Sequence, residues 1–447
     1  LANVTIGVSS SNTAEGTVSP TSVTFTPANW NVAQTVTATG VNDFVDDGDI
    51  AYTIVTAAAT SSDSLYNGLN AADVSATNVD NDTAGITVTP VSGLQTDESG
   101  GTASFTVVLN SQPTANVTIG VSSSDTTEGT VSVSSLTFTA ANWNVPQTVV
   151  VTGVDDLIDD GDIAYTIVTA AATSSDAIYN GLNASDVGVT NLDDDTAEIL
   201  VSAASSPTTT EDGGTSTFTV ELATQPLANV VITISSSNTA EGTASPTTLT
   251  FTPANWNVPQ TVTATGVDDF VVDGDIAYTI VTSVAVSSDP AYNGLNPDDV
   301  SLVNLDDDLN EVRVTTTSLV TTEPGVNGVF GVRLTSKPLS PVTIALSSAD
   351  TTEGVLSTNS LTFNASNWSV VQNVTVFSVD EFLVDGDITY SVIVSPAVST
   401  DARYSGYDAP DVTVTNLDDD TTNQRIYTIR PNGADDSYSL GVASGQI

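Results

Sequence analysis

A repeat of about 113 residues constrains this chain more than any other feature. Its four tryptophans lie 113, 113 and 112 residues apart (143−30, 256−143 and 368−256): Trp30, Trp143, Trp256 and Trp368. The same intervals separate four Asp-Gly-Asp-Ile segments at 47–50, 160–163, 273–276 and 385–388. Solenoid units are roughly 20 to 50 residues long, whereas about 100 residues suffice for a domain. The sequence therefore predicts a tandem array of small domains.

Within each period, short apolar runs alternate with polar residues. In the second repeat, Val, Ile, Leu and Phe alternate with Thr and Ser in seven runs: 86–96, 102–110, 116–123, 130–139, 147–154, 163–171 and 186–192. Such alternation marks strands with one buried and one solvated face. Seven short strands in about a hundred residues are typical of an immunoglobulin-like sandwich. The predicted fold is all-β, a tandem array of immunoglobulin-like antiparallel β-sandwiches.

The repeat boundaries predict five segments. Three full repeats cover 85–196, 197–309 and 310–420, and a truncated repeat at 1–84 lacks the first two strands. The tail at 421–447 reads as two further strands. Either the sequence is a window through a longer array, or the tail completes the truncated repeat of a neighbouring copy by strand addition. The second hypothesis predicts a head-to-tail homopolymer.

Acidic residues gather in the predicted loops, and almost no basic side chain is present to neutralise them. The formal net charge is −48, with six Lys and Arg residues, the first of them Arg313. The segment 155–162 holds five acids in eight residues. Two carboxylates about 4 Å apart repel by roughly 4 kcal/mol at an effective dielectric near 20. We therefore expect a cation from solvent, and oxygen-only ligands favour calcium.

Strand parity places the acidic loops together. If successive strands are antiparallel, the loops after the first, third, fifth and seventh strands share one pole. In the second repeat these loops hold the acids at 97–98, 125–128, 155–162 and 193–195, whereas the opposite loops at 111–114 and 140–144 hold none. The pattern predicts a cation-binding cup at one end of each domain. Asp176 lies in an opposite-pole loop, where it is either solvated or reaches the preceding cup.

Three motifs in this order and spacing resemble the Calx-beta domain, known from sodium/calcium exchangers and bacterial surface proteins. They are Glu98-Ser-Gly-Gly-Thr-Ala-Ser-Phe-Thr-Val, Asp155-Asp156-x-x-x-Asp160-x-Asp162 and Asp193-Asp194-Asp195. The resemblance covers nearly the whole chain. It implies that calcium is held by the early Glu, the acids of the long loop and the final Asp run. Ile163 stands where the family usually carries a further Glu, which leaves the number of ions open.

The predicted calcium ligands follow from this match, repeat by repeat. The full repeats contribute Glu98, Asp155, Asp156, Asp160, Asp193, Asp194 and Asp195; Glu211, Asp268, Asp269, Asp273, Asp306, Asp307 and Asp308; and Glu323, Asp380, Asp385, Asp418, Asp419 and Asp420. The truncated repeat contributes Asp43, Asp47, Asp80 and Asp82. It carries Asn42 and Asn81 in place of acids, so we expect a weaker site there.

Composition narrows the functional classes. Without His or Cys, a Ser-His-Asp or Cys-His arrangement is impossible, and the acidity disfavours nucleic acid and anionic lipid. Paired carboxylates can hydrolyse glycosides, but here they recur in every copy, so we predict that the chain is not an enzyme. No apolar stretch is long enough for membrane insertion.

The sequence thus predicts a calcium-stiffened structural repeat protein at the bacterial cell surface or outside the cell. It would serve as a fibre or filament, an adhesin stalk or a matrix component, with no surface or glycan ligand specified. Its predicted partners are further copies of itself or neighbouring repeats. Two alternatives remain: a calcium-sensing regulatory module, or non-catalytic spacer domains of a larger secreted enzyme.

Overall fold

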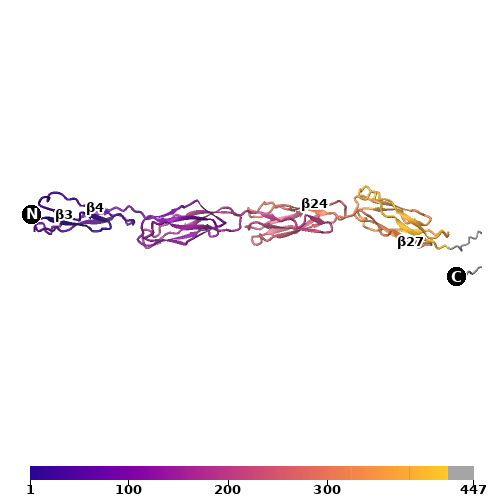
Figure 1. The fold of residues 1–447 in the computed structure, drawn as a ribbon, viewed down its shortest axis with the longest axis horizontal. Helices are drawn as coiled ribbons and strands as arrows, with labels where there is room; N and C mark the ends of the chain where they lie inside the picture. Colours follow the sequence, from indigo (N-terminus) through magenta and orange to yellow (C-terminus); the bar gives the residue numbers. More distant parts are fainter. Residues whose placement is uncertain (324, 382, 421–447) are drawn as a thin grey trace, which may run out of the picture.

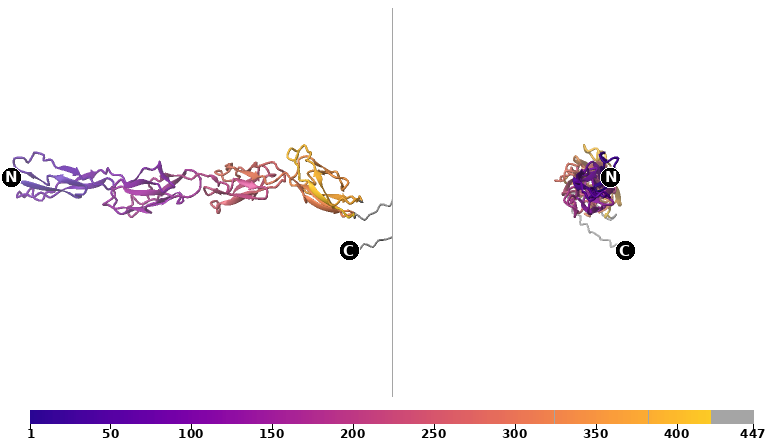
Figure 2. Two further views of the ribbon diagram at one scale, coloured as in Figure 1. Left: turned by 45° about the vertical axis from the view of Figure 1, so that its right-hand side comes forward. Right: turned by 90° about the vertical axis from the view of Figure 1, so that its left-hand side faces the viewer.

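Four groups of β-strands follow one another along a rod in the computed structural model (Figure 1). The structure describes residues 1–323, 325–381 and 383–420. The end-on view in Figure 2 superposes the four bodies, and the last of them tilts from the common axis. The segment 421–447, for which we predicted two strands, lies outside the described residues. Nowhere in the described ranges is there a helix long and apolar enough to cross a membrane.

The second domain is a sandwich of two sheets, ordered β12-β10-β14-β16-β8 (with β15 beside β10) and β11-β13-β9-β7. Phe105, Val149, Ile167 and Val187 are buried between them. The strands are β7 (Ile86–Thr89), β8 (Leu94–Asp97), β9 (Thr102–Leu109), β10 (Val117–Ser123), β11 (Gly129–Val131), β12 (Ser135–Phe138), β13 (Gln147–Gly153), β14 (Ile163–Thr169), β15 (Thr173–Ser174) and β16 (Val187–Leu192).

Two predicted strands are in fact divided between the sheets. The run 86–96 becomes β7 and β8, because Pro90 lacks an N–H and Gly93 adopts a positive φ of 77° between them. The run 130–139 likewise becomes β11 and β12. The prediction of unbroken strands was wrong there. After the switch, β8 pairs with β16 in parallel, which places Asp97 opposite Leu192 and brings Glu98 to the end of β16.

The third and fourth domains repeat this architecture. The third contains β17 (Ile199–Val201), β18 (Thr208–Thr210), β19 (Thr215–Leu222), β20 (Val230–Ser236), β21 (Gly242–Ser245), β22 (Thr248–Phe251), β23 (Gln260–Gly266), β24 (Ile276–Thr282) and β25 (Val300–Leu305). The fourth contains β26 (Val312–Val314), β27 (Ser318–Thr322), β28 (Gly328–Leu334), β29 (Val342–Ser348), β30 (Gly354–Leu356), β31 (Ser360–Phe363), β32 (Gln372–Ser378), β33 (Ile388–Val394) and β34 (Val412–Leu417).

The first domain has a smaller core than the others, formed by Val8, Tyr52 and Ile54. One sheet has the order β3-β1-β5-β6, and β2 pairs only with β4. The strands are β1 (Val4–Ser10), β2 (Gly16–Ser19), β3 (Ser22–Phe25), β4 (Thr37–Gly40), β5 (Ile50–Thr56) and β6 (Val74–Asn78). Strand β1 corresponds to β10, so counterparts of β7, β8 and β9 are missing from the described residues of this domain.

A long acidic loop follows β4, β13, β23 and β32, and in the first three domains it meets the next domain. These long acidic loops cover 41–49, 154–162, 267–275 and 379–387. The carbonyl oxygen of Phe44 accepts the backbone N–H of Gln112 at 2.6 Å, and its ring lies 5.9 Å from that of Trp143. Trp143 thus contacts the preceding domain as well as its own core.

Candidate metal centre

Four loops bring carboxylates together at one end of the second domain. Glu98 follows β8 and lies with Asp194 and Asp195, which follow β16, so that one oxygen of each falls within 4.8 Å of the others. A second group with the same spacing joins Glu128 to two acids of the long acidic loop, Asp156 and Asp160. The third domain also has two groups, Glu211 with Asp268 and Asp308, and Glu241 with Asp269 and Asp273. In the first of these, Asp268 from the long acidic loop takes the place that Asp194 has in the second domain.

The early Glu of each full domain is buried and incompletely paired. Glu98, Glu211 and Glu323 are 2, 3 and 4% exposed. One oxygen of each, Oε2, has no hydrogen-bond partner, and the same holds for buried oxygens of Asp195, Asp308, Glu381 and Asp420. Buried polar atoms in proteins almost always have a partner. In the described ranges the sole ion pair between side chains joins Arg403 to Asp401, so no basic side chain meets these oxygens.

Burial makes these carboxylates hard to ionise. Loss of solvent raises the pKa of Glu98 to about 7, with the charges of Asp156 and Asp193 adding to the effect. Burial raises the pKa of Glu211 to about 8 and that of Asp308 to about 6, again with neighbouring acids contributing. The pKa of Glu323 rises to about 7 from burial and from repulsion by Glu381. A nearby cation would reverse the balance and favour the charged forms.

Glycine and the first Asp of each Asp run fix the long acidic loop. Gly161 adopts φ 78° and donates its N–H to Asp193 Oδ2 at 2.7 Å. Asp193 Oδ1 accepts the N–H of Asp195 at 2.8 Å. The same contact joins Gly48 to Asp80, Gly274 to Asp306 and Gly386 to Asp418. These four predicted ligands therefore hold the loops together. Asp155, Asp307, Asp380 and Asp419 are exposed beside the groups.

A buried asparagine, Asn191, forms a hydrogen bond to Glu128 of the second carboxylate group. Asn191 Nδ2 donates to Glu128 Oε2 at 3.4 Å and to the carbonyl of Val154 at 3.1 Å. Its Oδ1 accepts the hydroxyl of Thr96 at 2.9 Å. The residue after Glu128 must be glycine, since a Cβ at Gly129 would collide with the ring of Tyr165. Hydrogen bonding therefore positions Glu128, and packing against Tyr165 requires the glycine that follows it.

The sequence placed the acids of 125–128 at the acidic pole, but the predicted ligands left out one glutamate in each domain. Glu15, Glu128 and Glu241 belong to the carboxylate groups, and Glu353 accepts Asn416 Nδ2 at 3.2 Å at the corresponding place. A signal was present, because Thr-x-Glu-Gly recurs at intervals of 113, 113 and 112 residues (128−15, 241−128 and 353−241).

The fourth domain crowds its acids in the same place. Glu381 belongs to the long acidic loop, and its pKa is raised by burial and by the charges of Glu353 and Asp385. Burial, followed by the charges of Asp418 and Asp419, raises the pKa of Asp420.

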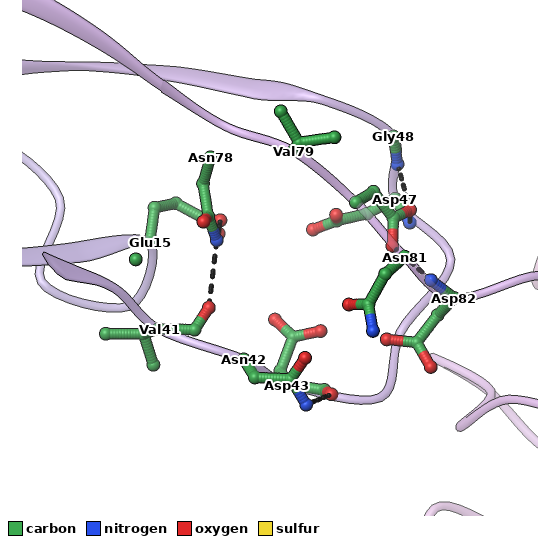
Figure 3. Close-up of a pocket in the computed structure, with 12 residues that line it drawn as sticks. Glu15, Val41, Asn42, Asp43, Asp47, Gly48, Asn78, Val79, Asn81 and Asp82 are labelled. Carbon is green, nitrogen blue, oxygen red and sulfur yellow. Dashed lines mark hydrogen bonds between the residues drawn. The ribbon is translucent and has the colours of Figure 1, made fainter.

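The first domain has an open cup. Glu15, Asp43 and Asp47 form its carboxylate group. Figure 3 shows these side chains around a cavity of about 220 Å3, together with Asn81 and Asp82. Asn42 and Asp80 also line the cavity. Asn42 and Asn81 stand where the full domains carry carboxylates, and a weaker site in this cup remains a prediction.

Asp176 does not reach a cup. Its side chain is buried within its own domain, where Oδ2 accepts the N–H of Thr114 at 2.7 Å and Oδ1 that of Ile178 at 3.0 Å. These hydrogen bonds lower the pKa of Asp176, although burial opposes them. Asp176 therefore ties two loops together. It is neither the solvated acid nor the joint ligand that the sequence suggested.

Calcium fits this donor set. The groups offer only carboxylate oxygens, some of them buried without partners, and calcium takes six to eight such ligands in flexible geometry. In each of the second and third domains, one group lies at the early Glu and one at the Thr-x-Glu-Gly Glu. The fold and site together define the described chain as an array of all-β domains, and the acidic poles of the first three face the joints.

Comparison with known proteins assigns the chain to no family. No family model matches the chain, and no curated protein matches it. Similar solved structures include CBD12 from CALX1.2 (14% identity, TM-score 0.21, 46% of this chain and 82% of that chain). The calcium binding domain CBD12 of CALX1.1 matches at 15% identity and TM-score 0.21, over 45% of this chain and 79% of that chain.

Domains 4–9 of the surface layer protein SbsC match over 92% of this chain and 57% of that chain, at 13% identity and TM-score 0.21. Scores this low carry no argument about function. The assignment to the all-β class rests on the strands and sheets of the chain itself.

Proposed function

We propose that this chain is a calcium-stiffened structural repeat protein of the bacterial surface or exterior, without enzymatic activity. The observation that carries the proposal is the buried early Glu, which keeps an unpartnered oxygen beside further carboxylates. A buried charge without a partner is strongly unfavourable, so the fold is complete only with a cation in the cup. Calcium supplies that charge, and the chain's own carboxylates bind and position it.

The position of the cups supports a mechanical role. In the first three domains the long acidic loop supplies two members of a carboxylate group and also contacts the following domain. Order in the loop and order at the joint therefore depend on each other. As partners we propose neighbouring repeats of the same kind, either in a longer chain or in a second copy. Roles as a fibre, adhesin stalk or matrix component all use such a rod.

Calorimetric titration with calcium, followed by melting with and without chelator, tests the proposal. We expect saturable calcium binding and a melting temperature that falls in chelator by well over 5 °C, since roughly 1 kcal/mol shifts a domain of this size by about 4 to 8 °C. Magnesium is the control, because it tolerates irregular carboxylate cages poorly. A melting temperature indifferent to chelator would overturn the proposal.

A further inference from the structure

The three joints share one contact, which each long acidic loop makes at its tip. The tip carbonyl oxygens accept backbone N–H groups of the next domain at 2.6, 2.6 and 2.7 Å, in the pairs Phe44 with Gln112, Leu157 with Gln225, and Phe270 with Lys337. Each tip lies between acids of the second carboxylate group; Leu157, for example, lies between Asp156 and Asp160. Opening of the loop would therefore break the joint.

The first two joints add a carboxylate from the same loop. Asp46 Oδ2 accepts the N–H of Ala84 at 2.8 Å, and Asp159 Oδ2 accepts that of Ala197 at 2.7 Å. Lys, Arg and His are all absent from the sequence before Arg313. In these two joints every charged side chain that the loop meets is thus acidic. Without a cation from solvent, repulsion favours an open loop.

The third joint is built differently. Val272 stands at the position of Asp159, and the fourth domain sends Arg403 across the joint in its place. Arg403 Nη1 donates to the carbonyl of Val272 at 2.7 Å. The guanidinium is held in a fork by Asp401, with Nε to Oδ1 at 3.0 Å and Nη2 to Oδ2 at 2.9 Å. Asn310, in the linker, donates its side-chain amide to the carbonyl of Arg403.

We propose that Arg403 is a fixed cation of the third joint, which keeps the third and fourth domains aligned when calcium is removed, while the first two joints loosen. Guanidinium stays charged at any physiological pH, and its planar fork is already oriented by Asp401. Its charge also acts on the cup: burial and nearby acids raise the pKa of Asp273, and Arg403 opposes them. The aromatic pair of Phe270 and Trp368 has a counterpart in the first joint, so it does not set the third joint apart.

The inference rests on the proposed function, because it presupposes that the second joint depends on calcium. Distances between paired spin labels can test both. The chain has no cysteine, so label pairs can be introduced at equivalent exposed positions on β12, β22 and β31, namely Thr137, Thr250 and Thr362. The pair Thr137→Cys with Thr250→Cys reports on the second joint. The pair Thr250→Cys with Thr362→Cys reports on the third joint.

In chelator, we expect the distance distribution to broaden at least twofold across the second joint and to stay narrow across the third. Arg403→Gln should broaden the third joint in chelator and leave it narrow in calcium. Arg333→Gln removes another positive charge of the fourth domain, one that forms no ion pair in the described residues; it is the matched control and should leave the third joint narrow in both conditions.

The outcomes distinguish failure of the calcium-stiffened rod from failure of the role proposed for Arg403. A second joint that stays narrow in chelator refutes the calcium-stiffened rod. If the second joint broadens and the third broadens equally in the unmodified chain, the role of Arg403 is refuted while the rod survives. If Arg403→Gln leaves the third joint narrow in chelator, other contacts hold it and the inference fails.

Discussion

Replacing Glu211 by glutamine should change stability in opposite directions with and without calcium. In the calcium-free protein the Glu211 carboxyl has a pKa of about 8, so at about pH 7.5 it is mostly protonated when folded. The unfolded chain ionises it near the ordinary 4.5. Holding the proton at pH 7.5 costs up to about 4 kcal/mol, at 1.36 kcal/mol for each pH unit above 4.5. Glutamine removes that cost, and its amide can donate to the adjacent carboxylates.

In calcium the same change should destabilise the domain. Because the substitution also stabilises the calcium-free domain by about 2 to 4 kcal/mol, a net loss of about 1 kcal/mol at saturating ion requires the binding free energy to fall by about 3 to 5 kcal/mol. That is a loss of roughly 200- to 5000-fold in affinity, which we expect when a buried anionic ligand is removed. The expected result is therefore a gain of about 2 to 4 kcal/mol in chelator and a loss of at least about 1 kcal/mol in calcium. A purely structural hydrogen-bonding role for Glu211 would not reverse sign.

Hydrogen exchange resolved by mass spectrometry can measure both values in the full chain. Peptides covering β19 and β24 report the opening of the third domain alone. Glu221→Gln, on β19 and outside both carboxylate groups, is the matched control and should have little effect in either condition. The reasoning is refuted if Glu211→Gln shifts protection in the same direction with chelator and with calcium.

Three further predictions follow from the same geometry. In chelator, the free energy of unfolding should fall as pH rises from about 4.5 to 8, because the folded cups hold protons that the unfolded chain releases. Urea melts at several pH values measure this, and a rise in stability with pH would contradict it. Calcium should abolish the fall. Gly129→Ala should destabilise the second domain by about 1 to 3 kcal/mol through overpacking against Tyr165, and calorimetry should show weaker calcium binding by that domain. Gly120→Ala is the control: its Cβ would lie 3.4 Å from that of Ala170, so we expect neither effect. Head-to-tail strand addition predicts a solution mass that grows with protein concentration in light scattering, and a constant monomer mass would exclude it.

Much of the cup could be predicted from the sequence, because the positions of the acids and the order of the strands both follow from the pattern along the chain. Alternation of apolar residues fixes which face of a strand is buried, and antiparallel order then assigns each loop to a pole. The acids of 155–162 and 193–195 had to meet once this order held. Glu128 was visible in the same way, since its Thr-x-Glu-Gly motif repeats with the domain. The predicted ligands followed the family resemblance, which implies the early Glu, the long loop and the final Asp run, so Glu128 was placed at the pole but not among the ligands.

The sequence by itself determined the repeat, the sandwich class and the end of each domain at which negative charge collects, because these depend on periodicity and composition. Only the tertiary structure decided that the strand at 86–96 crosses between sheets, that the acids divide into two groups, and that Asp176 is an internal tie. It also decided that Val272 and Arg403 meet across a joint. Those facts depend on which atoms approach within a few ångströms when separate loops pack together, and spacing along the chain does not encode that.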